Sequence, residues 1–222
     1  MDALSFLREL TGDGGIPYNE SKQHKEAERT MKVCVLMGSP RKNGNTAAIL
    51  EPFCDELRRD GAEVETIWLY DKEICPCVAC RNCQKDWSTF GCVQEDDGQE
   101  LFETILACDL LVLATPIYVW YCTPPMKALL DRLVYVMNKF YGEERGPSLW
   151  QGKAVALLET CGYPPEKGSD LFEAGMQRFC KHSGLRYLGS HVERHVGYHT
   201  EFMDEGKAER SRAFARSLLK MF

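Results

Sequence analysis

The 222-residue sequence has no long apolar run, no basic stripe and no low-complexity tract. A helix that spans a bilayer needs about 20 consecutive apolar residues, so we expect no membrane span. The net charge of −6 argues against nucleic acid or an anionic membrane as the partner. The first thirty residues mix acidic and basic side chains with glycine and proline, unlike a secretory signal. These features predict a cytoplasmic protein.

Three phosphate or hydrolase motifs are also missing. The chain has no G-x-G-x-x-G fingerprint, no loop ending in Gly-Lys-Ser/Thr, and no G-x-S-x-G elbow. Cysteine, in contrast, is abundant, with eleven residues. Six are scattered and suit small apolar packing positions, because disulfides are uncommon in a reducing compartment. The other five crowd between Cys75 and Cys92.

Short apolar runs alternate with helical patterns along the chain. This alternation predicts a parallel sheet covered by helices on both faces, in one α/β domain over 31–222. Residues 1–30 read as an N-terminal extension, and 71–99 as an inserted cysteine-rich loop. Strands are expected at 31–37, 63–68, 109–114, 153–159 and 186–196. Helices are expected from Asn45 or Thr46 to Gly61, near 101–106, and at 125–140, 170–182 and 204–221.

The loop after the first expected strand is rich in groups that bind phosphate. It reads Gly-Ser-Pro-Arg-Lys-Asn-Gly-Asn-Thr from Gly38 to Thr46, just before a helix. A helix N-terminus offers unpaired N–H groups and positive partial charge to an anion. Hydroxyls, amides and the Arg41 guanidinium can add further bonds. An ordinary polar turn is the simpler alternative, but the position after the first strand favours an anion site.

This loop resembles the phosphate loop of the NAD(P)H-dependent FMN reductase family. A second segment, Thr115 to Tyr121 followed by Pro125-Met126-Lys127 and Asp131-Arg132, resembles that family's segment after the third strand. The resemblance implies a flavodoxin-like three-layer α/β/α fold with a five-stranded parallel sheet in the order 2-1-3-4-5. It implies FMN at the carboxyl ends of the strands beside the topological switch point, where ligands bind in such sheets.

The resemblance also implies which residues contact the cofactor. Phosphate would be bound by Ser39, Arg41, Asn43, Asn45 and Thr46. The flavin would be contacted by Pro116, Ile117, Tyr118, Val119 and Trp120, although core or interface packing is the alternative for Tyr118 and Trp120. The turn after the fourth strand would add Thr160 and Gly162. Asp131 and Arg132 are interpreted as helix-surface or helix-packing residues, and no side chain is assigned a catalytic role.

The crowded cysteines have the spacing Cys75-x-Cys77-x2-Cys80-x2-Cys83-x8-Cys92. A C-x2-C-x2-C run is typical of cubane iron–sulfur binding, and it resembles the iron–sulfur flavoproteins of the same superfamily. That resemblance implies a [4Fe–4S] cluster on Cys77, Cys80, Cys83 and Cys92, with Cys75 as an alternative fourth ligand. Zinc is a second alternative. A metal-free loop that forms a lid beside the flavin, with redox-active thiols, is a third.

His191, His195 and His199 recur every four residues on or just after the last expected strand. They have no carboxylates at catalytic spacing, and we interpret them as surface histidines away from the flavin motifs.

Together these patterns predict an FMN-dependent oxidoreductase. NAD(P)H would reduce the flavin, which would reduce flavin, a quinone, a nitro or azo aromatic, or a protein. The alternative function is one-electron transfer as an iron–sulfur flavoprotein. The resemblance further implies a homodimer or homotetramer.

Overall fold

The structure, a computed structural model, describes residues 29–88, 90–197 and 199–222. Five strands form one parallel sheet in the order β2-β1-β3-β4-β5, which confirms the predicted fold and strand order. The strands are β1 (Lys32–Met37), β2 (Glu63–Trp68), β3 (Leu110–Pro116), β4 (Ala154–Cys161) and β5 (Arg186–Arg194). The expected extension at 1–30 lies almost wholly outside the described residues.

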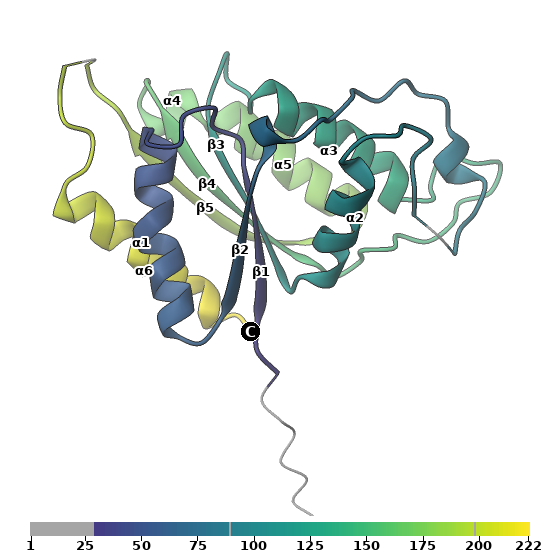
Figure 1. Cartoon of the computed structure of the whole chain (residues 1–222), viewed down its shortest axis with the longest axis horizontal. Coiled ribbons are helices and arrows are strands. Elements are labelled where there is room, and N and C mark those ends of the chain that lie inside the picture. Colours follow the sequence, from purple (N-terminus) through teal and green to yellow (C-terminus); the bar gives the residue numbers. More distant parts are fainter. Residues whose placement is uncertain (1–28, 89, 198) are drawn as a thin grey trace, which may run out of the picture.

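Helices cover both faces of the sheet (Figure 1). On one face α1 and α6 pack side by side, and on the other lie α2, α3 and α5. The helices are α1 (Asn45–Arg59), α2 (Gly98–Ala107), α3 (Pro124–Met137), α4 (Pro165–Gly168), α5 (Asp170–Ser183) and α6 (Glu205–Leu219), with short 3₁₀ turns η1 (Leu69–Asp71) and η2 (Asn82–Gln84). None of the helices described combines the length and the apolar character that a bilayer crossing requires.

The three central strands explain why their sequences read as continuous apolar runs. β1, β3 and β4 are buried on both faces, so successive side chains enter opposite halves of the core. In β1, for example, Val33 and Val35 lie in the core half that contains α1 and α6, whereas Cys34 and Leu36 lie in the half that contains α2 and α3. The chain leaves β1 toward β2 and returns on the other side at β3, which creates the switch point between β1 and β3.

Strand ends and α2 differ from the expectations by one to three residues, and three further differences have a physical reason. Gly44, not Asn45 or Thr46, precedes the first turn of α1 as its N-cap. Helix α3 ends at Met137 rather than near Phe140, because residues from Asn138 pair with the segment that returns at Ser148. The four-residue α4 was not predicted, since one turn has no measurable period.

Candidate functional site

The loop between β1 and α1 leaves the first turn of α1 open to an anion. Gly44 offers no side-chain cap, and no acidic residue lies in the first turn. Unpaired N–H groups and the positive end of the helix dipole are therefore exposed to the loop. Ser39 Oγ accepts a bond from the Arg41 backbone N–H at 3.2 Å, and Gly44 N–H donates to Arg41 O at 3.1 Å. The loop is a tight polar turn around a helix N-terminus, a geometry that suits phosphate.

Gly38 brings this loop against the start of α3. Its N–H donates to Ala114 O at 2.7 Å. A Cβ at this position would lie 2.8 Å from Thr123 Oγ1 and 3.2 Å from Thr115 Oγ1. A side chain would therefore push the loop away from β3 and α3, and the loop could no longer curl at the sheet edge.

The segment after β3 forms a tight turn that projects from the sheet. Ile117 N–H donates to Thr160 O at 2.8 Å, and Tyr118 and Tyr121 exchange backbone bonds of 2.8 and 3.0 Å. Between them Val119 and Trp120 have φ of +51° and +63°, the left-handed pair of a type I′ turn. A β-branched residue rarely adopts this conformation, and such strain concentrates at functional sites.

These two loops border an open cleft at the carboxyl ends of the strands, which we call the strand-end cleft. Most of its lining was predicted from the sequence. The cleft residues are Arg41, Asn45, Pro116, Ile117, Tyr118, Thr160, Cys161, Gly162, His195 and Gly197. The cleft contains no carboxylate among these residues, so its charge suits an anionic ligand at the Arg41 end.

A second hollow continues from the cleft past Ile117 and Gly162. Val119 and Trp120 line it, and the Trp120 ring stacks on Tyr163 with centroids 6.0 Å apart and an interplanar angle of 13°. Trp120 Nε1 donates to Lys167 O at 2.9 Å, which fixes the indole. The two flat rings make a wall that suits a planar ligand.

Three predicted phosphate residues do not line the cleft. Ser39 is buried inside the turn, and Thr46 Oγ1 lies 2.7 Å from Thr160 Oγ1 in a buried contact that ties α1 to β4. Asn43 lines a separate groove beside β2. Phosphate contacts from these side chains stay predictions.

The interpretation of the histidines is wrong for two of the three. His195 lines the strand-end cleft. His191 is mostly buried, with Nε2 3.1 Å from Ser211 Oγ, and burial lowers its pKa. Only His199 is exposed. The signal for His195 was available, because β5 ends at Arg194 and parallel strands share the edge at which their carboxyl ends meet.

Sequence reasoning also missed Glu159, which is fully buried in β4 beside the cleft residue Thr160. The Ser169 hydroxyl donates to its Oε2, and its Oε1 has no hydrogen-bond partner among the described residues. Burial raises the pKa of Glu159 to about 8. The carboxyl is therefore mainly protonated at neutral pH. A lone acid within an otherwise apolar strand was the signal.

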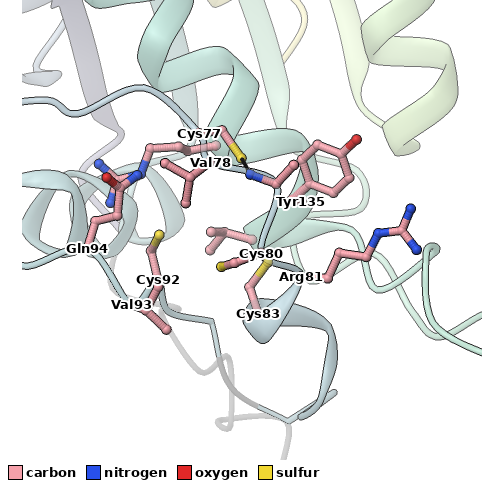
Figure 2. Close-up of a pocket in the computed structure, with 12 residues that line it drawn as sticks. Cys77, Val78, Cys80, Arg81, Cys83, Cys92, Val93, Gln94 and Tyr135 are labelled. Atoms are coloured by element: carbon pink, nitrogen blue, oxygen red, sulfur yellow. Dashed lines mark hydrogen bonds between the residues drawn. The ribbon is translucent and has the colours of Figure 1, made fainter.

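Four cysteines from the inserted loop line one hollow, which we call the cysteine cavity (Figure 2). Cys80 and Cys83 lie together on one side of it, and Cys92 lies across from them. Cys77 is the fourth, and the cavity lies against Tyr135 and Val136 of α3. The four cysteines predicted as ligands therefore line one cavity, and metal binding by Cys77, Cys80, Cys83 and Cys92 stays a prediction.

Cys75, the alternative fourth ligand, does not line the cysteine cavity. Its backbone instead closes the base of the loop. Cys75 N–H donates to Asp96 Oδ2 at 2.8 Å, and its carbonyl accepts a bond of 3.4 Å from Arg132 Nη1. Cys92 is thus the better candidate for the fourth thiolate.

A buried ion pair holds this base. Arg132 Nη1 lies 2.5 Å from Asp96 Oδ2, and both side chains are fully buried. Burial raises the pKa of Asp96, but bonds from Arg132, Cys75 and Gly98 bring it below its ordinary value. Asp131 pairs instead with Lys127 on the surface at 2.6 Å. Asp131 and Arg132 are thus a helix-surface and a helix-packing residue, each with a different partner.

The far side of the loop is fixed to the end of α3. Gln84 is buried and donates from Nε2 to the carbonyls of Tyr135 and Asn138. The Lys139 ammonium, also buried, donates to Cys83 O at 2.5 Å. Both ends of the Cys77–Cys83 run are consequently held by α3 and the residues that follow it.

The donor set at the cysteine cavity fits an iron–sulfur cluster. Four thiols line the cavity, and cysteine thiolates are the ligands that hold such clusters. Cysteine thiolates also bind zinc. Among the described residues, no three Cys, His, Asp or Glu side chains are placed to share one metal ion.

The described part of residues 71–99 lines neither the strand-end cleft nor the hollow beside it. The cleft lies at the carboxyl ends of the strands, whereas the cysteine cavity lies against Tyr135 and Val136 near the C-terminal end of α3. The lining of the two cavities therefore does not favour the alternative in which the loop forms a lid over a ligand in the cleft.

Known proteins with similar sequences and folds agree with this geometry. The chain is 36% identical over 136 residues to an iron–sulfur flavoprotein of Archaeoglobus fulgidus, covering 61% of this chain and 58% of the relative. It is 34% identical over 110 residues to an iron–sulfur flavoprotein of Methanosarcina thermophila, covering 49% and 56%. The chain thus spans little more than half the length of these curated relatives.

Among solved structures, an NAD(P)H:quinone oxidoreductase from Methanothermobacter marburgensis matches with a TM-score of 0.62 and 22% identity, covering 86% of this chain and all of that one. At this identity the likeness shows the shared fold. The NADPH-dependent FMN reductase family model matches residues 31–171, which include the phosphate loop, the segment after β3, and β4 with the turn that follows it. The chain therefore belongs to the NADPH-dependent FMN reductase family.

Proposed function

We propose that the protein is an FMN-dependent oxidoreductase that passes reducing equivalents from NAD(P)H to an acceptor. The observation that carries the proposal is the strand-end cleft, where Arg41 and the open first turn of α1 stand at one end and the Pro116–Tyr118 backbone at the other. The cationic end suits the phosphate of FMN, and the extended backbone suits hydrogen bonds to a flavin edge.

When bound, FMN supplies the hydride chemistry, and the protein supplies binding, orientation and electrostatics. Trp120 and Tyr163 border the hollow next to the cleft, where a planar acceptor or the nicotinamide would stack. Val119, Thr160 and Gly162 complete the walls. The acceptor class is a flavin, a quinone, a nitro or azo aromatic, or a redox protein.

An anaerobic titration tests this function. Purified protein loaded with FMN is mixed with NADH or NADPH, and the flavin absorbance is followed before and after a quinone is added. We expect bleaching by one of the two nucleotides and recovery by the quinone. Protein that binds FMN but is not bleached by either nucleotide would disprove the proposal.

A second candidate function is one-electron transfer as an iron–sulfur flavoprotein. It is favoured by the four thiols that line the cysteine cavity and by relatives that carry this name. The cavity would hold a [4Fe–4S] cluster on Cys77, Cys80, Cys83 and Cys92. Iron and sulfide analysis after anaerobic purification tests it, with four of each per chain expected.

The remaining expectations belong to the same proposal. One FMN-binding domain would extend over 31–222, with the cysteine-rich insert at 71–99. A homodimer or homotetramer is supported by exposed apolar side chains beside the cleft, among them Tyr118, Val119 and Tyr163. A cytoplasmic location is supported by the eleven cysteines, which are all within the described residues and unpaired.

A further inference from the structure

Two cationic side chains are buried at the cysteine cavity: Arg132 lines it, and Lys139 contacts Cys83, one of the cysteines that line it. Arg132 and Lys139 are each about 1% exposed. Buried charges are costly unless they are paired or hydrogen-bonded, so their positions require an explanation.

Arg132 is only partly satisfied by its neighbours. Its Nη1 bonds to Asp96 and to the Cys75 carbonyl. Its Nε and Nη2 are buried and have no hydrogen-bond partner among the described residues. The side chain lines the same cavity as Cys92, so the unused N–H groups lie where a thiolate or sulfide could accept their bonds.

Lys139, in the segment that follows α3, contacts the opposite side of the loop. Its ammonium donates to the carbonyl of Cys83, one of the four cavity cysteines. An ammonium has three N–H donors, and this bond is made by one of them. Asp86 is the acidic residue whose charge acts on Lys139 from the loop itself.

Four thiolates around an iron–sulfur core carry net negative charge. A cluster in this cavity would have Arg132 beside Cys92 and Lys139 beside Cys83. Cluster potentials depend on net charge, on hydrogen bonds to sulfur and on exposure to solvent. Both cations act in the same direction, because each stabilises the more negative, reduced state.

We propose that Arg132 and Lys139 are positioning residues for an anionic iron–sulfur cluster in the cysteine cavity, where they hold the cluster and raise its reduction potential. This inference rests on the iron–sulfur candidate of the proposed function. It assigns to Arg132 a second role beyond the ion pair that closes the loop.

The experiment uses the full chain, purified anaerobically and loaded with iron and sulfide. Iron content and the cluster's reduction potential are measured for wild type, Arg132→Lys, Lys139→Gln and Lys139→Arg. Lys127→Gln is the matched control, because it removes a positive charge from α3, the helix of Arg132, at a position that does not line the cavity. Circular dichroism verifies that each variant is folded.

We expect Lys139→Gln and Arg132→Lys to shift the potential to more negative values, while Lys139→Arg and Lys127→Gln stay near wild type. A second result would also support the proposal: Lys139→Gln loses iron, while Lys139→Arg and Lys127→Gln keep full iron content. The positive charge at position 139 would then be what retains the cluster. Full clusters with the wild-type potential in both Lys139→Gln and Arg132→Lys would overturn it.

Wild-type protein that takes up no iron would overturn both this inference and the iron–sulfur candidate. The NAD(P)H-driven bleaching of bound FMN is measured on the same samples. That reading decides the flavin function separately, so a failure of one proposal is distinguishable from a failure of the other.

Discussion

Arg41 and Lys42 are adjacent cations that point to different parts of the molecule. Arg41 lines the strand-end cleft, whereas Lys42 pairs with Asp71 and lies 4.2 Å from the Trp68 ring centroid. Substituting each residue in turn therefore distinguishes a direct contact with the FMN phosphate from a general effect of positive charge on FMN binding.

Arg41→Ala is expected to weaken FMN binding by 10- to 100-fold, because a hydrogen bond to a charged group contributes about 1.5–3 kcal/mol. Lys42→Ala should change the FMN dissociation constant by less than about threefold, as expected for an exposed pair. Titration of apoprotein with FMN, followed by flavin fluorescence, measures both. Equal effects of the two variants would contradict the assigned role of Arg41.

Glu159 gives stability a pH dependence of known sign. Its folded pKa of about 8 lies above the ordinary value of 4.5, so the unfolded chain releases the proton first as pH rises. The contribution of this group to stability is full below pH 4.5 and is lost progressively up to about pH 8. The total loss is on the order of 5 kcal/mol as an upper value.

The Glu159→Gln variant removes this titration while keeping the shape of the side chain. We expect the free energy of unfolding of the variant to rise relative to wild type between pH 5 and pH 8. Urea unfolding at several pH values measures the difference. A difference that stays constant across that range would show that Glu159 does not titrate as described.

At the scale of elements, α2 begins with a residue that must lack a side chain. A Cβ on Gly98 would lie 2.5 Å from Arg132 Nη2, at the buried ion pair. Gly175, on the exposed side of α5, has nothing within 4 Å of such a Cβ. The two helical glycines therefore make a matched pair.

Gly98→Ala is expected to destabilise the fold by about 1–3 kcal/mol, the usual cost of overpacking a buried site. Gly175→Ala should stabilise it by about 0.5–1 kcal/mol through helix propensity alone. Thermal unfolding of both variants tests the pair. A stabilising Gly98→Ala would mean that Arg132 moves freely, contrary to its buried contacts.

Elements could be predicted where a local sequence pattern specifies them, and not where contacts between distant residues do. The central strands were predictable because a strand that is buried on both faces has apolar side chains at consecutive positions, as in Leu110–Ala114. Gly44 was missed as the N-cap because propensity favours Asn or Thr, whereas the loop needs a residue that leaves the helix start open. The partner of Arg132 was beyond reach, since Asp96 lies 36 residues away in a loop without periodicity.

The candidate site followed a similar rule. Two local motifs predicted Arg41, Asn45 and Pro116 to Tyr118, because contiguous residues form each wall. His195 and Glu159 were not predicted as site or near-site residues. Their importance comes from strand neighbours in the sheet and from the direction of a side chain in a buried strand, neither of which a local pattern contains.

For the whole molecule, the exposed turn after β3 bears on assembly. Val119 is 83% exposed although apolar, and it stands at the tip of the turn next to exposed Tyr118 and Trp120. Contiguous apolar surface of this kind is typical of interfaces between chains.

Val119→Glu is expected to shift a dimer or tetramer toward monomer, because the charge would be buried at the interface. Met221→Glu is the control, since Met221 is an exposed apolar residue at the other end of the chain. Light scattering at several concentrations reports the mass. A wild-type monomer, or an unchanged assembly in Val119→Glu, would rule out this turn as the contact.

The pinned base of the cysteine loop also has a consequence in terms of chain entropy. Closing a flexible segment of 21 residues, the separation between Cys75 and Asp96, costs on the order of 3 kcal/mol by the logarithmic loop-length relation. Because the Cys75, Asp96 and Arg132 contacts close this segment when the chain folds, the cost does not fall on metal uptake. The thiols are then held at a high effective concentration. Metal at low concentration would bind them without the entropic cost of ordering an open chain.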